Sequence, residues 1–213
     1  MSPRISSVVF DLGGVLITPI TTLLDEIAEW HGITMVEMLG VLMGPREISS
    51  GDHPWHRCER GELPTASLQH EVGPFAERAG LNLRGDEYER LLCGDFELHD
   101  EMIDRISRLR SEGYAIALLT NSFKEFRDHL ERRIDFDLFD VVVDSSEVGC
   151  RKPEPEIYEL TTWRLGGDPA SILYIDDFLA NVEGGRRAGW STIHLTNVAD
   201  ALADLDRALT AHS

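Results

Sequence analysis

Residues 8–16 read Val-Val-Phe-Asp-Leu-Gly-Gly-Val-Leu, and the interpretation of the whole chain starts from this stretch. The apolar run before Asp11 predicts a buried strand, and the glycines after it predict a sharp turn. A carboxylate placed where a buried strand meets a turn suits a nucleophile or a metal ligand. Gly13, two residues further on, has no side chain that could assist. Asp11 is therefore the first candidate functional residue.

Four more short apolar runs follow later in the chain, and helical patterns separate them from one another. Alternating strands and helices predict an α/β fold, here a doubly wound, Rossmann-like parallel sheet with right-handed crossovers. The predicted strands are 5–11, 115–120, 141–144, 172–176 and 191–195, and the predicted helices of this part are 102–111, 123–133, 156–165, 179–188 and 200–211.

The interval between the first two strands has a different character. Residues 18–98 contain amphipathic stretches at 22–30, 35–43, 65–79 and 86–92, but no convincing strand. We interpret them as a helical cap inserted after the first strand and placed over the carboxyl edge of the sheet, where open α/β sheets bind ligands. Residues 1–17 and 99–213 then form the core. Trp55 is the aromatic residue of the cap that best suits substrate contact.

Polar residues stand at or just beyond the ends of the first four predicted strands. In a parallel sheet these ends share one edge, so the side chains can converge on one pocket. Besides Asp11, they are Thr120, Asn121 and Ser122 after the second strand, Lys152 after the third, and Asp176 and Asp177 at the end of the fourth.

Three carboxylates gathered at one edge would form an oxygen-rich site of the kind that Mg²⁺ prefers. Their mutual repulsion would be relieved by a divalent cation and by Lys152, which is one of only two lysines in the chain. The hydroxyl groups of Thr120 or Ser122 and nearby main-chain N–H groups can hold phosphate oxygens. The residues therefore point to Mg²⁺ as cofactor and to a phosphorylated ligand.

Four motifs in this order resemble the haloacid dehalogenase-like hydrolase superfamily: VVFDLGGVL (8–16), LLTNS (118–122), CRKPEPEIY (150–158) and YIDDFLANVEGGRRAG (174–189). Within it, the chain is similar to small phosphatases related to the N-terminal domain of soluble epoxide hydrolase and to bacterial sugar-1-phosphate phosphatases. The resemblance covers essentially the whole chain. Residues 55–62 look like the segment that precedes a cap helix in that subgroup.

The resemblance implies a Mg²⁺-dependent phosphatase acting on a small phosphorylated metabolite. Asp11 would be the nucleophile that forms an aspartyl-phosphate, Thr120 and Asn121 would orient the phosphoryl group, and Lys152 would neutralise charge. Asp177 would coordinate Mg²⁺ together with Asp11 and the carbonyl of Gly13. Asp176 would ligate the ion directly or through water.

Gly13 departs from the superfamily pattern, because most of its phosphatases carry a second aspartate there as general acid and base. General acid–base help is worth roughly 10²–10⁴-fold in rate. Three outcomes stay open: a substrate whose leaving group hardly needs a proton, such as a sugar 1-phosphate; a substitute such as His31, His56 or Glu59; or a slow or inactive enzyme.

Two other functions remain as alternatives. A metal-free 2-haloacid dehalogenase shares the fold and the nucleophile, but Asp176 and Asp177 would repel the haloacid carboxylate. A catalytically degenerate domain would bind phosphoesters or a protein without turnover. A phosphonatase with a cap lysine is disfavoured, because residues 18–98 contain no lysine.

Composition restricts the partners. The net charge of −18 disfavours nucleic acid, which binds clustered basic residues, and no apolar run approaches the length of a membrane span. Cys58, Cys93 and Cys150 are odd in number and widely spaced, which favours free thiols in a reducing cytoplasm. We expect a cytoplasmic monomer or homodimer that acts on a small phosphoester.

Overall fold

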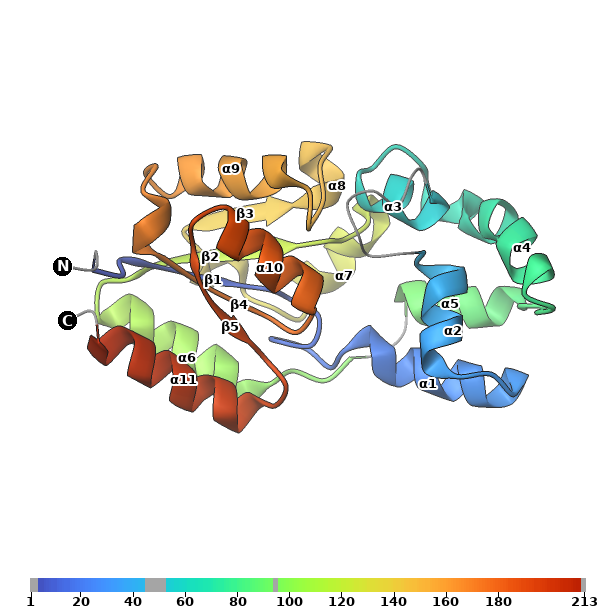
Figure 1. Ribbon diagram of the computed structural model, residues 1–213, viewed down its shortest axis with the longest axis horizontal. Coiled ribbons are helices and arrows are strands. Elements are labelled where there is room, and N and C mark those ends of the chain that lie inside the picture. The colour runs from blue at the N-terminus through green and yellow to red at the C-terminus, as the bar shows by residue number, and fades with distance from the viewer. Residues whose placement is uncertain (1–3, 45–52, 94–95, 212–213) are drawn as a thin grey trace.

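The computed structural model describes residues 4–44, 53–93 and 96–211. A five-stranded parallel sheet lies at its centre, in the order β3-β2-β1-β4-β5 (Figure 1). The predicted α/β fold with a parallel sheet is confirmed, and all five predicted strands form, with shorter ends at the first and the last. The strands are β1 (Ser7–Phe10), β2 (Ala115–Thr120), β3 (Val141–Asp144), β4 (Ile172–Asp176) and β5 (Ser191–His194).

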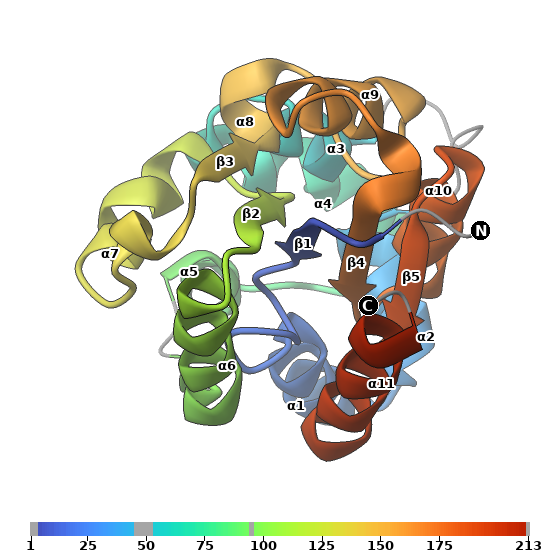
Figure 2. The same cartoon turned by 90° about the vertical axis from the view of Figure 1, so that its left-hand side faces the viewer.

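Helices cover both faces of the sheet (Figures 1 and 2). On one face lie α6 (Asp100–Ser111) and α11 (Val198–Ala211), and on the other lie α9 (Pro155–Arg164) and α10 (Leu179–Arg187). The side chains of β1 alternate between the two apolar clusters: Val8 and Phe10 belong to the first face and Val9 to the second. All three are fully buried, which is why this strand is a continuous apolar run.

The segment predicted as a helix at 123–133 is shorter and less regular than expected. A 3₁₀ turn, η2 (Lys124–Phe126), leads into α7 (Arg127–Glu131). The short helix α8 (Ser145–Val148) was not predicted, because four residues are too few to show a helical period. Two further 3₁₀ turns, η3 (Phe136–Leu138) and η4 (Pro169–Ser171), precede β3 and β4.

Between β1 and α6 the described chain forms helices and no strand, as expected, and these helices share an apolar cluster of their own. Residues 55–62 do precede further helical elements, η1 (Thr65–Ser67) and α4 (Leu68–Arg78), and most of the segment is itself helical, because a helix begins at Pro54. Proline suits the first helical position, and His53 Nδ1 accepts the Trp55 N–H at 3.2 Å. The elements are α1 (Ile20–His31), α2 (Met35–Leu42), α3 (Pro54–Glu59), η1 (Thr65–Ser67), α4 (Leu68–Arg78) and α5 (Gly85–Cys93).

Two antiparallel segments connect these helices to the sheet. The Thr18 N–H donates to the Glu97 carbonyl at 2.9 Å, and the His99 N–H donates to the Leu16 carbonyl at 2.9 Å. The pairing sets α1–α5 beyond the carboxyl ends of the strands, on the right of Figure 1. Across the part of the chain that the structure describes, no helix is both long and apolar enough to cross a bilayer.

Candidate active site

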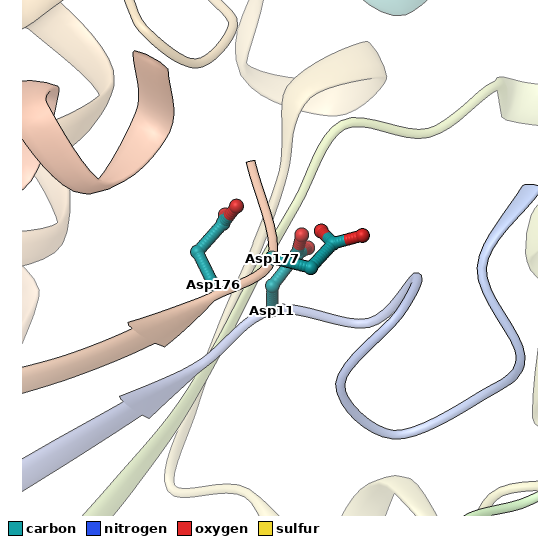
Figure 3. A group of neighbouring side chains, drawn as sticks. All are labelled: Asp11, Asp176 and Asp177. Atoms are coloured by element: carbon teal, nitrogen blue, oxygen red, sulfur yellow. The ribbon is translucent and has the colours of Figure 1, made fainter. Parts of the chain in front are cut away.

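Asp11, Asp176 and Asp177 lie together at the carboxyl edge of the sheet (Figure 3). Asp11 follows β1, Asp176 ends the neighbouring strand β4, and the pairing of Phe10 with Ile175 sets these ends level. One carboxylate oxygen from each of the three aspartates lies within 4.8 Å of the other two. The convergence expected from the sequence therefore occurs.

Lys152 lies against this cluster. Its Nζ is 2.6 Å from Asp11 Oδ1 and 2.8 Å from Asp176 Oδ2, and its side chain is only 1% exposed. Burial lowers the pKa of Lys152, but the charges of Asp11 and Asp176 outweigh this effect and raise the pKa above its ordinary value. The lysine is therefore a fixed positive charge at the site.

Asp176 is held by hydrogen bonds on both oxygens. Oδ1 accepts the Phe178 N–H at 2.7 Å, Oδ2 accepts from the Tyr174 hydroxyl, and the Asn181 amide lies 3.1 Å from both. Burial favours the protonated acid, but Lys152 and these hydrogen bonds hold the pKa of Asp176 below its usual range. Both oxygens of Asp176 already accept hydrogen bonds from the protein. Asp176 is therefore suited to orient Lys152, or to contact a metal ion through a water molecule.

Asp11 is engaged differently. Its Oδ1 accepts the Leu12 N–H at 2.6 Å and contacts Lys152, and among the described residues Oδ2 has no hydrogen-bond donor. Burial and the charge of Asp176 raise the pKa of Asp11, although Lys152 opposes them. With all three carboxylates ionised, one lysine leaves an excess of two negative charges. A divalent cation matches that excess, and carboxylate oxygens are the ligands that Mg²⁺ prefers.

Residues 120–122 lie at the end of β2 and line the same cavity. The Asn121 side chain binds the main chain of Lys152: Oδ1 accepts its N–H at 2.8 Å, and Nδ2 donates to its carbonyl at 2.9 Å. This contact, which the sequence did not reveal, positions the lysine. Thr120 is buried and its hydroxyl donates to the Asn121 carbonyl at 3.4 Å, whereas the buried Ser122 hydroxyl has no hydrogen-bond partner among the described residues.

The two glycines after Asp11 differ in their surroundings. A Cβ added to Gly13 would meet nothing within 4 Å, whereas a Cβ on Gly14 would come within 2.2 Å of Asp177 Oδ2. Gly14 also has a φ of 74°, which favours glycine. Gly14 is therefore needed to let Asp177 approach the turn, and the turn has room for a side chain at position 13.

Gly14→Ala is expected to lower the free energy of unfolding by about 1–3 kcal/mol, because the new methyl group is strained by its backbone and displaces Asp177. Gly13→Ala is the matched control, and we expect it to change stability by less than about 1 kcal/mol. Urea unfolding of both variants measures the difference. Equal losses at the two positions would contradict the close approach of Asp177.

A cavity of about 840 Å³ opens from the aspartates toward the helices α1–α5. Its inner end is lined by the site residues described above, including Gly13. Its outer part is lined mainly by apolar side chains from α1, α3, α5 and the segment after β2. Trp55 lies in this lining, 2% exposed, with its ring against Phe123 at 5.0 Å. The expectation that it faces the substrate pocket agrees with this position.

None of the three proposed substitutes for the missing acid is well placed for that role. Glu59 reaches the cavity, but its Oε1 accepts the Trp55 indole N–H at 3.0 Å and its Oε2 is ion-paired with the buried Arg151. His31 is bound to Glu87 at 2.9 Å. Neither His31 nor His56 belongs to the described cavity lining. Spacing along the chain could not reveal the Glu59–Arg151 pair, because the two residues are 92 positions apart.

Comparisons with known proteins agree with this architecture. The family model of haloacid dehalogenase-like hydrolases matches residues 5–189. Acyl-CoA dehydrogenase family member 10 of Mus musculus is 30% identical over 210 residues, and the match covers 95% of this chain but only 19% of that protein. Sesquiterpene phosphatase astK of Aspergillus oryzae is 27% identical over 205 residues, covering 92% of this chain and 93% of that protein.

Among solved structures, the magnesium complex of a HAD family enzyme from Bacteroides thetaiotaomicron has a TM-score of 0.65 at 22% identity, over 95% of this chain and 98% of that one. The relatives include further phosphatases and a haloacid dehalogenase. The match to the family model spans most of the chain, including β1 to β4 and the four site segments. The chain therefore belongs to the haloacid dehalogenase-like hydrolases, a family of enzymes.

Proposed function

We propose that this hydrolase is a Mg²⁺-dependent phosphatase, which cleaves a small phosphorylated metabolite through an aspartyl-phosphate on Asp11. The observation that carries the proposal is the cluster of three aspartates and Lys152 at the inner end of the cavity. In this proposal residues 18–98 form the cap that shapes the cavity, and residues 1–17 and 99–213 form the catalytic core.

The metal ligands in this proposal are Asp11, Asp177 and the Gly13 carbonyl, with Asp176 bound directly or through water. The donor set fits Mg²⁺, because it is made of oxygens and carries an excess of two negative charges. When bound, the ion supplies charge stabilisation for the transferring phosphoryl group. Asn181 and Tyr174 hold Asp176 in place.

The residues of the chain perform two steps. In the first, an Asp11 carboxylate oxygen bonds to phosphorus, and the bond from phosphorus to the substrate's alcohol oxygen breaks. In the second, water attacks the aspartyl-phosphate and releases inorganic phosphate, which regenerates Asp11. Lys152 offsets negative charge on Asp11 and on the phosphoryl group throughout. Thr120 and Ser122 hold phosphoryl oxygens, and Asn121 fixes the main chain of Lys152.

Gly13 leaves the departing alcohol without a positioned proton donor. Substrates whose leaving groups need little protonation, such as sugar 1-phosphates, should therefore react faster than sugar 6-phosphates. The test compares the rates of phosphate release from glucose 1-phosphate and glucose 6-phosphate. A faster rate with glucose 6-phosphate would contradict the idea that Gly13 is tolerated because the leaving group needs little protonation.

Gly13→Asp is expected to raise kcat for ethyl phosphate by about 10²-fold or more, because it supplies a general acid. The position has room for the side chain. The rate with p-nitrophenyl phosphate should change little, because nitrophenolate leaves without a proton. Gly13→Asn, which has the same size but no acidic proton, is the control. A Mg²⁺ titration of each variant should still show saturation. An equal change in kcat with ethyl phosphate and p-nitrophenyl phosphate would contradict the role of the new side chain as a general acid.

The function is tested by measuring phosphate release from a panel of phosphate monoesters, with Mg²⁺ and with EDTA. We expect release that requires Mg²⁺. Chloride release from 2-chloropropionate in EDTA would instead identify a dehalogenase. Binding of phosphate esters with no turnover of any of them would identify a degenerate binding domain.

A further inference from the structure

The outer part of the cavity is built from large apolar side chains. Leu23 comes from α1, Trp55 from α3 and Leu91 from α5, while Phe96, Phe123 and Phe126 come from the segments beside them. We call these six residues the apolar wall. Covering apolar surface of this kind with an apolar group stabilises the complex by about 25 cal/mol for each Å² removed from water. Sugar hydroxyls placed against it would lose hydrogen bonds to water without replacement.

The polar groups beside the wall are mostly occupied by neighbouring residues. Both Glu59 oxygens are held as described above, and Asp86 is bound to Arg84 at 3.0 Å. Arg90, the described cation in this part of the lining, is bound to Glu26 at 2.9 Å and lies over the Trp30 ring. These groups therefore offer few hydrogen bonds to a polar substrate.

The charges of the outer lining also restrict the substrate. Glu26, Glu59, Asp86 and Glu89 are acidic, and the first three are ion-paired with Arg90, Arg151 and Arg84. The four acids and their partners together carry an excess of one negative charge. A second anionic group on the substrate would meet this excess of negative charge after its phosphate reached Lys152. A carboxylate or a second phosphate is therefore disfavoured in the outer cavity.

We infer that the substrate is the monophosphate ester of an uncharged, apolar alcohol, with its hydrocarbon part against the apolar wall. This inference rests on the proposed phosphatase function and narrows it. The cavity volume of about 840 Å³ leaves space for a hydrocarbon body well beyond the phosphate. The phosphate lies at Asp11 and Lys152, and the alcohol extends toward α1 and α5.

The first test measures kcat/KM for ethyl, butyl, hexyl and octyl phosphate with Mg²⁺, because these esters share one leaving-group chemistry. We expect an increase of about two- to fourfold per added methylene, which amounts to at least about 60-fold over the six methylenes from ethyl to octyl. Octyl phosphate bearing a terminal carboxylate should be at least about tenfold worse than octyl phosphate. Glucose 6-phosphate, which like octyl phosphate is the ester of a primary alcohol, should fall below octyl phosphate.

A pair of variants tests whether the preference for long alkyl chains depends on the apolar wall. Leu23→Gln should lower kcat/KM for octyl phosphate by about tenfold more than it lowers kcat/KM for ethyl phosphate. Val36→Gln is the control, because Val36 is 72% exposed and lies outside the described lining. Thermal unfolding checks that both variants are folded.

The outcomes separate the two proposals. Phosphate release that is independent of chain length, that is faster for glucose 6-phosphate than for octyl phosphate, or that responds equally to Leu23→Gln with short and long esters overturns the apolar substrate and leaves the phosphatase intact. If no ester in the series is hydrolysed with Mg²⁺, while octyl phosphate binds, the phosphatase proposal itself fails.

Discussion

Asp11→Asn is expected to abolish phosphate release, with a loss of about 10⁴-fold or more in kcat. An amide oxygen cannot replace the carboxylate as a nucleophile, and the change also removes the negative charge that lies 2.6 Å from Lys152. Phosphate release with Mg²⁺ and a saturating ester measures the effect.

The matched control is Asp144→Asn. Asp144 is also a buried aspartate at the carboxyl end of a strand, but its Oδ1 accepts the Ser146 N–H at 2.9 Å and the Ser146 hydroxyl at 2.7 Å, and it lies outside the described cavity lining. An asparagine can accept the same hydrogen bonds, so turnover should change by less than about tenfold. Retention of activity in Asp11→Asn, or equal losses in the two variants, would contradict the assignment of the nucleophile.

The same variant has an expected effect on stability that does not depend on turnover. Burial and the charge of Asp176 raise the pKa of Asp11 above its ordinary value of 3.8. The folded protein without metal therefore holds the Asp11 proton more tightly than the unfolded chain, and its stability falls as the pH rises above 3.8. Asparagine cannot ionise, so in EDTA at pH 7 Asp11→Asn should unfold at a higher temperature than the wild type.

This stability difference should shrink as the pH is lowered toward 4, because it accumulates only as the pH rises above the ordinary aspartate pKa of 3.8. Adding Mg²⁺ should stabilise the wild type more than the variant, because a ligand stabilises the state that binds it. Thermal unfolding at pH 4 and pH 7, with and without Mg²⁺, measures both effects. A Mg²⁺ shift of equal size in the two proteins would show that Asp11 does not contribute to metal binding.

The sequence predicted the parallel sheet because its strands are short runs that are buried on both faces, and Val8, Val9 and Phe10 show that pattern. It also predicted which carboxylates meet, because the carboxyl ends of parallel strands share an edge. The involvement of Tyr174 was also open to prediction, because it precedes Asp176 by two residues and so lies on the same face of β4.

Other features depend on contacts that spacing cannot reveal. The Asn121 side chain holds the main chain of Lys152, although the two residues are 31 positions apart. The helix α3 is six residues long, which is too short for a periodic signal. Trp30 and Trp163 are 55% and 75% exposed, which the sequence does not indicate. Tryptophan combines a large apolar surface with a polar N–H, so residue type alone does not decide its burial.

Arg151→Met is expected to lower the free energy of unfolding by about 3–5 kcal/mol. Arg151 is 2% exposed and Glu59 is 3% exposed, so the substitution removes the arginine from a buried carboxylate. The pair joins α3 to the segment that carries Lys152, so the substitution removes an interaction that holds these two parts of the chain together. Arg108→Met is the control, because its ion pair with Glu112 is exposed, and such pairs are worth about 0–1 kcal/mol.

The double variant Arg151→Met/Glu59→Leu separates the pair's attraction from the penalty of leaving one charge buried. Apolar residues of similar volume can replace a buried ion pair at little net loss, so we expect the double variant to recover most of the stability that Arg151→Met loses. Urea unfolding of the wild type, both single variants and the double variant gives the coupling energy. Additive losses in the double variant would mean that the two side chains contribute independently, and the ion pair would then not explain how α3 is held to the Lys152 segment.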